Sequence, residues 1–207
     1  MNEKNFDFMA LQLTFLLGVV YAAQVFTGFD PGFNASSSPF YKFFTSIVGH
    51  SSLQHLLNNA FFIGLFGSIY ERLTSGRTFL ATFFAAALLA NLSAFVFYPT
   101  SSIIGASGGA MGVLSALAVY RPRKVGLALG VPAPMWFVLL SYIFINFAGI
   151  PAATGTAYEA HLFGMAAGAP AGYWLRDRPY LKGGGKTEDD GDDWRERIRE
   201  WEEKWMM

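Results

Sequence analysis

The sequence predicts an all-α membrane protein in which six transmembrane helices form one bundle, and both its composition and its hydrophobic pattern lead to this prediction. Of the 207 residues, 53% are hydrophobic and 14% are charged, whereas about a quarter of the residues in a soluble domain carry a charge. The hydrophobic residues form six runs, at about 9–27, 53–70, 78–98, 107–120, 127–148 and 158–175. Several runs approach the roughly 20 residues that a helix needs to cross a bilayer.

Basic residues orient these spans, because lysine and arginine near span ends favour the cytoplasmic side. They follow the second, fourth and sixth runs, at Arg72, Arg77, Arg121, Arg123, Lys124, Arg176, Arg178, Lys182 and Lys186. The connections on the other side contain a basic residue only in the first of them, at Lys42. We therefore expect a multi-pass protein of the cell membrane with both termini in the cytoplasm.

We expect residues 1–181 to form the membrane domain and residues 182–207 to form a polar cytoplasmic tail. From about residue 192 the tail carries hydrophobic side chains at helical spacing, at Trp194, Ile198, Trp201 and Trp205. This spacing suits an amphipathic helix on the inner membrane surface, and a partner-binding or disordered tail fits the composition equally well.

The first run is expected to be a span rather than a cleaved signal peptide, because the residues before it include Glu3 and Asp7 against Lys4. The aromatic-rich loop at about 29–52 suits either a position in the membrane interface or ordinary folding on the protein. The second run carries the polar residues His55 and Asn59. The third run is interrupted by polar side chains that we interpret as helix–helix hydrogen bonders, Asn91 and Ser93.

The fourth run opens with the glycine-rich stretch 105–112, which places Ser107 at the start of a helix. From Ser107 to Tyr120 the run would form about 21 Å of helix, against a hydrocarbon core of about 30 Å. Residues 99–106 must therefore lie below the outer surface, where irregular backbone is tolerated only if protein covers it or it lines a wet cavity. We expect a water-filled hollow with Ser107 at its floor.

The fifth run contains no ionisable residue and is interpreted as scaffold. The sixth carries His161 near its outer end, on the same helical face as Gly168 and Gly172 and close to Gly164. We therefore expect His161 on the face that approaches another helix most closely.

Helical rise brings four polar residues to one depth. Counted from the nearest arginine at the cytoplasmic boundary, Ser107 lies about 21 Å up, His161 about 23 Å, Asn59 about 20 Å and His55 about 26 Å. A histidine can accept the proton of a serine hydroxyl, so Ser107 and His161 would form a nucleophile and base. His55, Asn59 and the Ser107 amide would stabilise an oxyanion, by about 3–4 kcal/mol per donor in a well-studied protease.

Three motifs in this order carry a family resemblance over roughly residues 40–175. They are His55-Leu56-Leu57-Asn58-Asn59, then Gly105-Ala106-Ser107-Gly108, then Ala160-His161-Leu162-Phe163-Gly164-Met165-Ala166-Ala167-Gly168. In these motifs the chain resembles the rhomboid intramembrane serine proteases, in a minimal six-span form. The expected fold is therefore a rhomboid-like bundle.

The resemblance implies an endopeptidase that cuts single-span membrane proteins near the outer surface through an acyl-enzyme. It implies Ser107 as nucleophile and His161 as general base without a third acidic member, with the oxyanion hole formed by His55, Asn59 and the Ser107 amide. The supporting positions are Gly105, Gly108, Met111 and His50. No cofactor or metal is expected, and the expected partners are transmembrane substrates and the lipid bilayer. The sequence names neither the substrate nor the oligomeric state.

The chain departs from the family at Met111, where many members have an aromatic residue packed against the catalytic histidine. A methionine thioether can also pack on an imidazole, so the resemblance leaves open how firmly His161 is oriented. Glu159, two residues before His161, lies about 200° round the helix and is expected at the rim.

Two other functions also fit the sequence. One is a rhomboid-like protein that binds or escorts membrane segments without cutting them. Another is a metal-dependent hydrolase in which His50, His55 and His161 hold the ion, although no H-E-x-x-H motif accompanies them. The net charge of zero gives no indication of nucleic-acid binding, and the absence of cysteine excludes a disulfide, a thiol nucleophile and a thiolate metal site.

Overall fold

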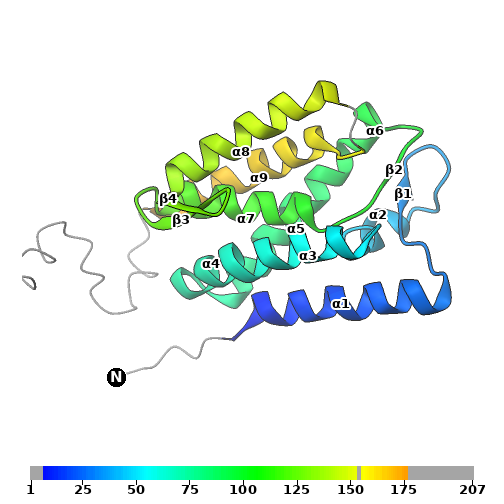
Figure 1. Cartoon of the computed structure of the whole chain (residues 1–207), viewed down its shortest axis with the longest axis horizontal. Coiled ribbons are helices and arrows are strands. Elements are labelled where there is room, and N and C mark those ends of the chain that lie inside the picture. Colours follow the sequence, from blue (N-terminus) through cyan, green and yellow to red (C-terminus); the bar gives the residue numbers. More distant parts are fainter. Residues whose placement is uncertain (1–6, 153–154, 177–207) are drawn as a thin grey trace, which may run out of the picture. The chain divides into compact units, whose positions relative to one another are not determined.

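The computed structural model describes residues 7–152 and 155–176, and this part of the chain is mostly helical. All six hydrophobic runs contain helix, as Figure 1 shows. The expected cytoplasmic tail and its amphipathic helix lie outside the described residues.

Two helices begin and end where the hydrophobic runs do, namely α1 (Met9–Thr27) and α7 (Ser107–Tyr120). The second run is the helix α3 (Leu53–Phe62), which continues through the π-helical turn η1 (Ile63–Gly67) into α4 (Ser68–Leu73). The third run is α5 (Gly76–Leu92) with the short α6 (Ala94–Phe97), and the sixth is α9 (Tyr158–Arg176). Among the described helices, Met9–Thr27 and Gly76–Phe97 are long and apolar enough to cross a membrane.

The fifth run does not form one helix from residue 127, as its hydrophobicity suggests. Its first residues form an antiparallel hairpin of β3 (Val125–Ala128) and β4 (Val131–Pro134), and helix α8 begins only at Met135 and ends at Gly149. Gly130 turns the hairpin with a φ of +84°, and two prolines at 132 and 134 oppose helix formation there. A 3₁₀ turn, η2 (Ile150–Ala152), follows α8.

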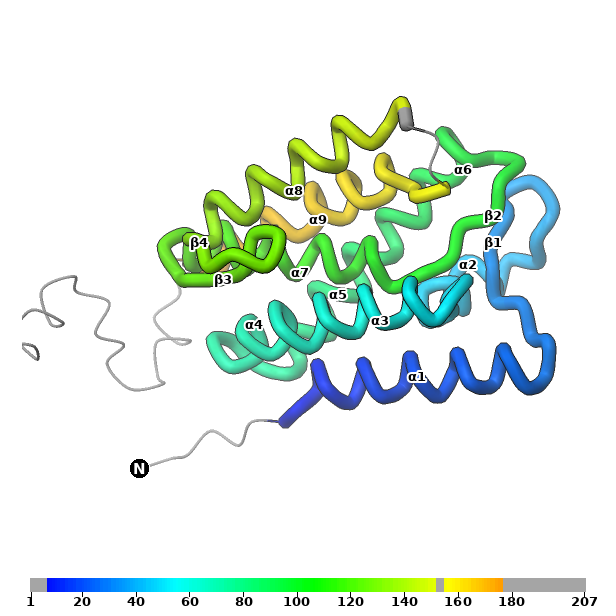
Figure 2. Tube along the Cα trace, in the orientation of Figure 1, coloured from blue at the N-terminus to red at the C-terminus, as the bar shows by residue number. Residues whose placement is uncertain are grey.

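Helix α7 lies in the middle of the bundle, between α5, α9 and the α3–α4 helix (Figure 2). Almost all of its residues are buried. Its contact with α9 is a backbone-to-backbone contact, because a Cβ on Gly168 would lie 1.9 Å from the Gly112 carbonyl oxygen. The same close approach repeats one turn on each side, where Gly164 meets Gly108 and Gly172 meets Ala116. The expectation that α9 presents its glycine face to another helix is confirmed.

A buried carboxylate fixes the start of α1. Glu71, on α4, is 2% exposed and accepts hydrogen bonds from the backbone N–H groups of Met9 and Ala10, each at 2.9 Å. A carboxylate at a helix N-terminus satisfies amides that have no intrahelical partner and is favoured by the helix dipole. This contact ties α1 to the second helical run.

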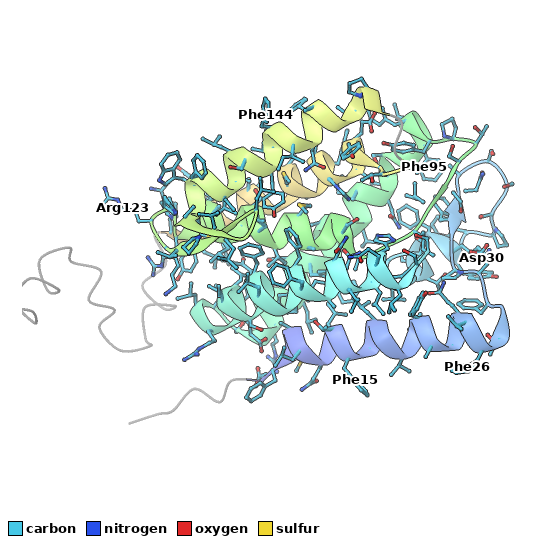
Figure 3. The ribbon with its side chains drawn as sticks, in the orientation of Figure 1. Phe15, Phe26, Asp30, Phe95, Arg123 and Phe144 are labelled. Carbon is cyan, nitrogen blue, oxygen red and sulfur yellow. The ribbon has the colours of Figure 1, made fainter. Side chains whose placement is uncertain are left out.

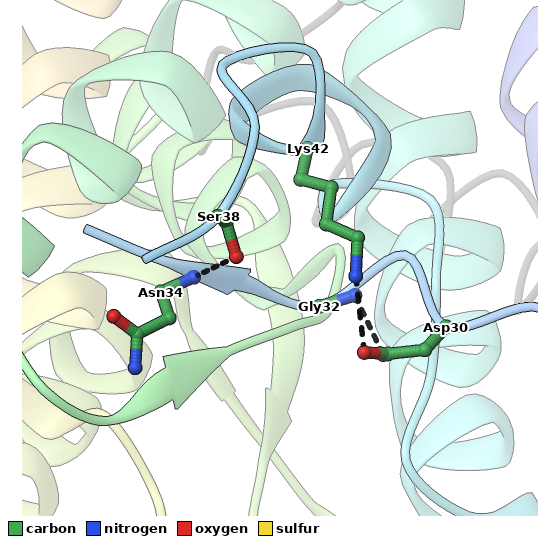
Figure 4. Close-up of polar contacts among 5 residues, drawn as sticks. All are labelled: Asp30, Gly32, Asn34, Ser38 and Lys42. Carbon is green, nitrogen blue, oxygen red and sulfur yellow. Dashed lines mark hydrogen bonds and ion pairs between the residues drawn. The ribbon is translucent and has the colours of Figure 1, made fainter. Parts of the chain in front are cut away.

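The loop between α1 and α3 is folded onto the protein. It contains β1 (Phe33–Asn34), which pairs with β2 (Ser102–Ile103), and α2 (Lys42–Thr45). The Gly32 N–H and the Lys42 ammonium both bind the Asp30 carboxylate and hold the pKa of Asp30 below its usual value (Figure 4). Whether this loop also lies in a membrane interface stays a prediction.

The two polar side chains of the third run act within the protein in different ways. Asn91 donates hydrogen bonds to the Phe43 carbonyl (2.6 Å) and the Ser46 hydroxyl (2.9 Å), so it anchors the α2 loop rather than another long helix. The Ser93 hydroxyl donates to the Ala90 carbonyl at 2.6 Å, within its own helical run. The interpretation as helix–helix hydrogen bonders is therefore confirmed for Asn91, which bonds to helix α2, and is wrong for Ser93.

Candidate active site

Ser107 is the first residue of α7, and the irregular backbone before it brings it into the bundle. Gly105 donates its N–H to the Ser46 carbonyl at 2.9 Å and has a φ of +131°, a conformation that favours glycine. Helix geometry leaves the first N–H groups of α7 without intrahelical acceptors. The Ser107 amide can therefore donate to a bound group beside its own hydroxyl.

His161 lies in the first turn of α9, and its Nε2 atom is 2.8 Å from the Ser107 hydroxyl oxygen. Its Nδ1 atom is 2.8 Å from the side-chain oxygen of Asn146, on α8. The glycine contacts between α7 and α9 allow the Ser107–His161 approach, since side chains at those positions would hold the helices apart. The two residues expected to act together are thus within hydrogen-bond distance.

His55 and Asn59 come from α3, one helical turn apart. The Nδ1 atom of His55 is 3.1 Å from the Ser51 hydroxyl, and the Asn59 amide donates to the His55 carbonyl at 3.0 Å. An asparagine amide has two N–H groups, so this bond leaves one for another acceptor. The imidazole of His55 lies against Gly105, where a Cβ would be 2.6 Å from the ring.

These residues line one cavity of about 830 Å³. Its lining includes Ser107, His161, His55, Asn59, Gly105 and Met111. The short fourth run predicts a hollow that reaches Ser107, and the structure has one there. Its filling with water and its opening toward the outer side stay predictions.

His50 lies behind His55 and not in the cavity lining. Its ring is 1% exposed, and its centroid is 5.1 Å from that of His55 in an edge-on arrangement. Gln24, on α1, forms hydrogen bonds with both the N–H (2.9 Å) and the carbonyl (3.0 Å) of His50. Burial, with a smaller effect from His55, lowers the pKa of His50 to about 4, so this ring is neutral near pH 7. These contacts suit the supporting position expected for it.

The sequence matches the family model of the Rhomboid domain over residues 37–178. The chain belongs to the rhomboid family. Rhomboid-related protein 2 of Mus musculus is 25% identical over an alignment of 146 residues, which covers 64% of this chain and 47% of that protein. The chain therefore spans about half the length of the curated relative that it matches. Membership of the family makes the chain a membrane protein, in agreement with its two long apolar helices.

The motif glycine Gly108 allows close packing of α7 on α5, because a Cβ there would lie 2.4 Å from the Ala90 methyl group.

The side chain at the position of the expected aromatic residue is Met111, which is 7% exposed and lines the cavity. The aromatic ring beside the His161 imidazole comes from Tyr158 instead, at 6.3 Å between centroids and nearly perpendicular.

Asn146 is the residue of this site that the sequence interpretation missed. The fifth run has no ionisable residue and was therefore assigned only a scaffold role, yet its one asparagine contacts His161. Glu159, expected at the rim, accepts a hydrogen bond from the Tyr98 hydroxyl. A polar residue inside an otherwise apolar run is the signal that could have identified Asn146.

Replacing Gly105 by alanine is expected to displace the His55 ring, because the new Cβ would lie 2.6 Å from it, and NMR of the histidine side chains should show a changed His55 signal. Gly130→Ala is the matched control, since Gly130 also has a positive φ but has no atom within 4 Å of an added Cβ. Both variants should lose stability from backbone strain. The same His55 signal in the two variants would contradict the close Gly105–His55 contact.

Proposed function

We propose that this rhomboid protein is an intramembrane serine endopeptidase that cuts single-span membrane proteins near the outer membrane surface. The observation that carries the proposal is the 2.8 Å separation between Ser107 Oγ and His161 Nε2 within a cavity. A serine hydroxyl beside an imidazole, at the start of a helix, suits acyl transfer, because the imidazole can accept the hydroxyl proton and the helix amides can bind an oxyanion.

The chain crosses the membrane six times in this proposal, with both termini in the cytoplasm. Arg123 and Asp30 lie at opposite ends of the bundle, and Phe15, Phe26 and Phe144 project from its sides (Figure 3). These three phenylalanines are 75%, 88% and 73% exposed, which suits contact with lipid. Helix α7 can be short because its neighbours in the bundle cover it.

Acylation begins when the Ser107 oxygen attacks the carbonyl carbon of the scissile peptide bond. The Ser107 proton passes to His161 Nε2, and the carbonyl oxygen becomes an oxyanion. The Ser107 amide and the side chains of His55 and Asn59 donate hydrogen bonds to it. As the C–N bond breaks, His161 returns the proton to the leaving amine, and the acyl group stays on Ser107.

Deacylation repeats these steps with water as the nucleophile. His161 takes a proton from the water, the hydroxide adds to the acyl carbon, and the Ser107 oxygen leaves with the proton that His161 returns. In this proposal the water reaches Ser107 through the cavity that it lines. The products are a carboxylic acid and an amine, and Ser107 is restored.

The metal-dependent alternative is less well supported. His161 uses both ring nitrogens in contacts with Ser107 and Asn146, and His50 lies outside the cavity lining. A three-histidine metal site would require His161 to give up one of these contacts.

A fluorophosphonate probe tests the proposal directly. The Ser107 oxygen should displace fluoride from the probe, and peptide mass spectrometry should find the phosphonyl group on Ser107 alone. Heat-denatured protein is the control, since activation depends on the folded His161 contact. Labelling at another residue would contradict the proposal. Specific binding of a single-span protein without labelling would favour the escort function instead.

A further inference from the structure

Asn146 is buried in the apolar helix α8, where a polar side chain needs hydrogen-bond partners. It is 3% exposed, and its amide nitrogen donates to the Tyr142 carbonyl of the same helix at 2.7 Å. Its amide oxygen is 2.8 Å from His161 Nδ1. The amide nitrogen and the amide oxygen of Asn146 therefore each have a hydrogen-bond partner.

These two contacts determine which way the Asn146 amide faces. A backbone carbonyl only accepts hydrogen bonds, so the Asn146 nitrogen must face Tyr142 and the oxygen must face His161. The oxygen in turn only accepts, so His161 must carry its proton on Nδ1. In a neutral imidazole this leaves Nε2 unprotonated, and Nε2 is the atom 2.8 Å from the Ser107 hydroxyl.

A second contact from α8 lies one turn further along the helix. A Cβ on Gly149 would lie 2.4 to 2.7 Å from the ring of Tyr158, so the ring lies directly on this glycine. Tyr158 then places its ring edge-on to His161, three residues later on α9. Helix α8 thus meets the first turn of α9 at both the imidazole and the aromatic ring beside it.

We propose that Asn146 is the positioning residue for the His161 base. Its contact from α8 orients the imidazole in a chain that has Met111 where many family members have an aromatic residue packed against the catalytic histidine. This inference rests on the proposed protease function. Asn146 selects the Nδ1–H form of His161 and holds the ring toward Ser107. Because its amide is neutral, it does so without placing a charge among apolar helices.

Asn146→Leu removes the acceptor oxygen at similar volume. We expect kcat for a membrane substrate to fall by about 10- to 100-fold with KM little changed, as for other residues that orient a catalytic group. Asn146→Gln keeps both the acceptor oxygen and the donor nitrogen without a charge and should recover part of this loss. Asn146→Ala tests the same point if leucine prevents folding. Ser141→Ala is the matched control, because Ser141 is on α8 and bonds to the Phe137 carbonyl of its own helix.

The histidine tautomer provides a readout that does not depend on proteolysis. Nitrogen-15 NMR of the three histidines should show the Nδ1–H form for His161 in the wild type, and a shift toward the Nε2–H form in Asn146→Leu. An unchanged tautomer, or kcat in Asn146→Leu equal to that of Ser141→Ala, would overturn the inference. If wild-type protein neither cleaves nor reacts with fluorophosphonate, the protease function fails, whereas the tautomer still tests the contact.

Discussion

Cleavage of a single-span substrate in proteoliposomes is expected to stop when either Ser107 or His161 is replaced by alanine. Each substitution removes one side of the 2.8 Å contact that transfers the proton. In another serine protease, loss of the nucleophile or the base alone costs about 10⁶-fold in kcat, nearly as much as loss of the whole set. The double variant should therefore be no slower than either single variant.

Ser115→Ala is the matched control for this experiment. Ser115 is a buried serine of the same helix, 2% exposed and outside the cavity lining. Its replacement should leave cleavage close to that of the wild type. Undiminished cleavage by Ser107→Ala would rule out the serine-protease function, and metal-dependent cleavage by that variant would favour the three-histidine alternative.

Replacing Gly168 by alanine is expected to destabilise the protein by about 3 kcal/mol and to remove most of its activity. The new Cβ would lie 1.9 Å from the Gly112 carbonyl oxygen, and backbone cannot move aside as a side chain can. Helices α7 and α9 must therefore separate, and the Ser107–His161 contact spans these two helices. Thermal unfolding in detergent and the cleavage assay measure the two effects.

Gly18→Ala provides the comparison for Gly168→Ala. Gly18 is also helical, but no atom lies within 4 Å of an added Cβ, so alanine should be neutral or stabilise α1 by up to about 1 kcal/mol. Equal unfolding temperatures for the two variants would show that the α7–α9 contact tolerates a methyl group. That result would contradict the packing described for these helices.

The sequence predicts the fold correctly where one hydrophobic run forms one helix. The first and fourth runs end where α1 and α7 end, because Gly28 follows the first and Pro122 lies just after the fourth. The fifth run shows the limit of this reasoning. Hydropathy does not distinguish the β3–β4 hairpin from a helix, whereas the prolines at 132 and 134 do.

The three motifs carried the family resemblance, and residue types with helical rise predicted Ser107 and His161 as a pair at one depth. These depend on residue types and on helical rise, which the sequence contains directly. The partner of His161 needed the tertiary structure. If one helix ran on from Lys124, Asn146 would lie about 33 Å along it from Lys124. Helix α8 begins only at Met135, so Asn146 lies about 17 Å along the helix from its first residue. Only the folded hairpin brings Asn146 near the level of His161, and only the packing of α8 against α9 turns its amide toward the ring.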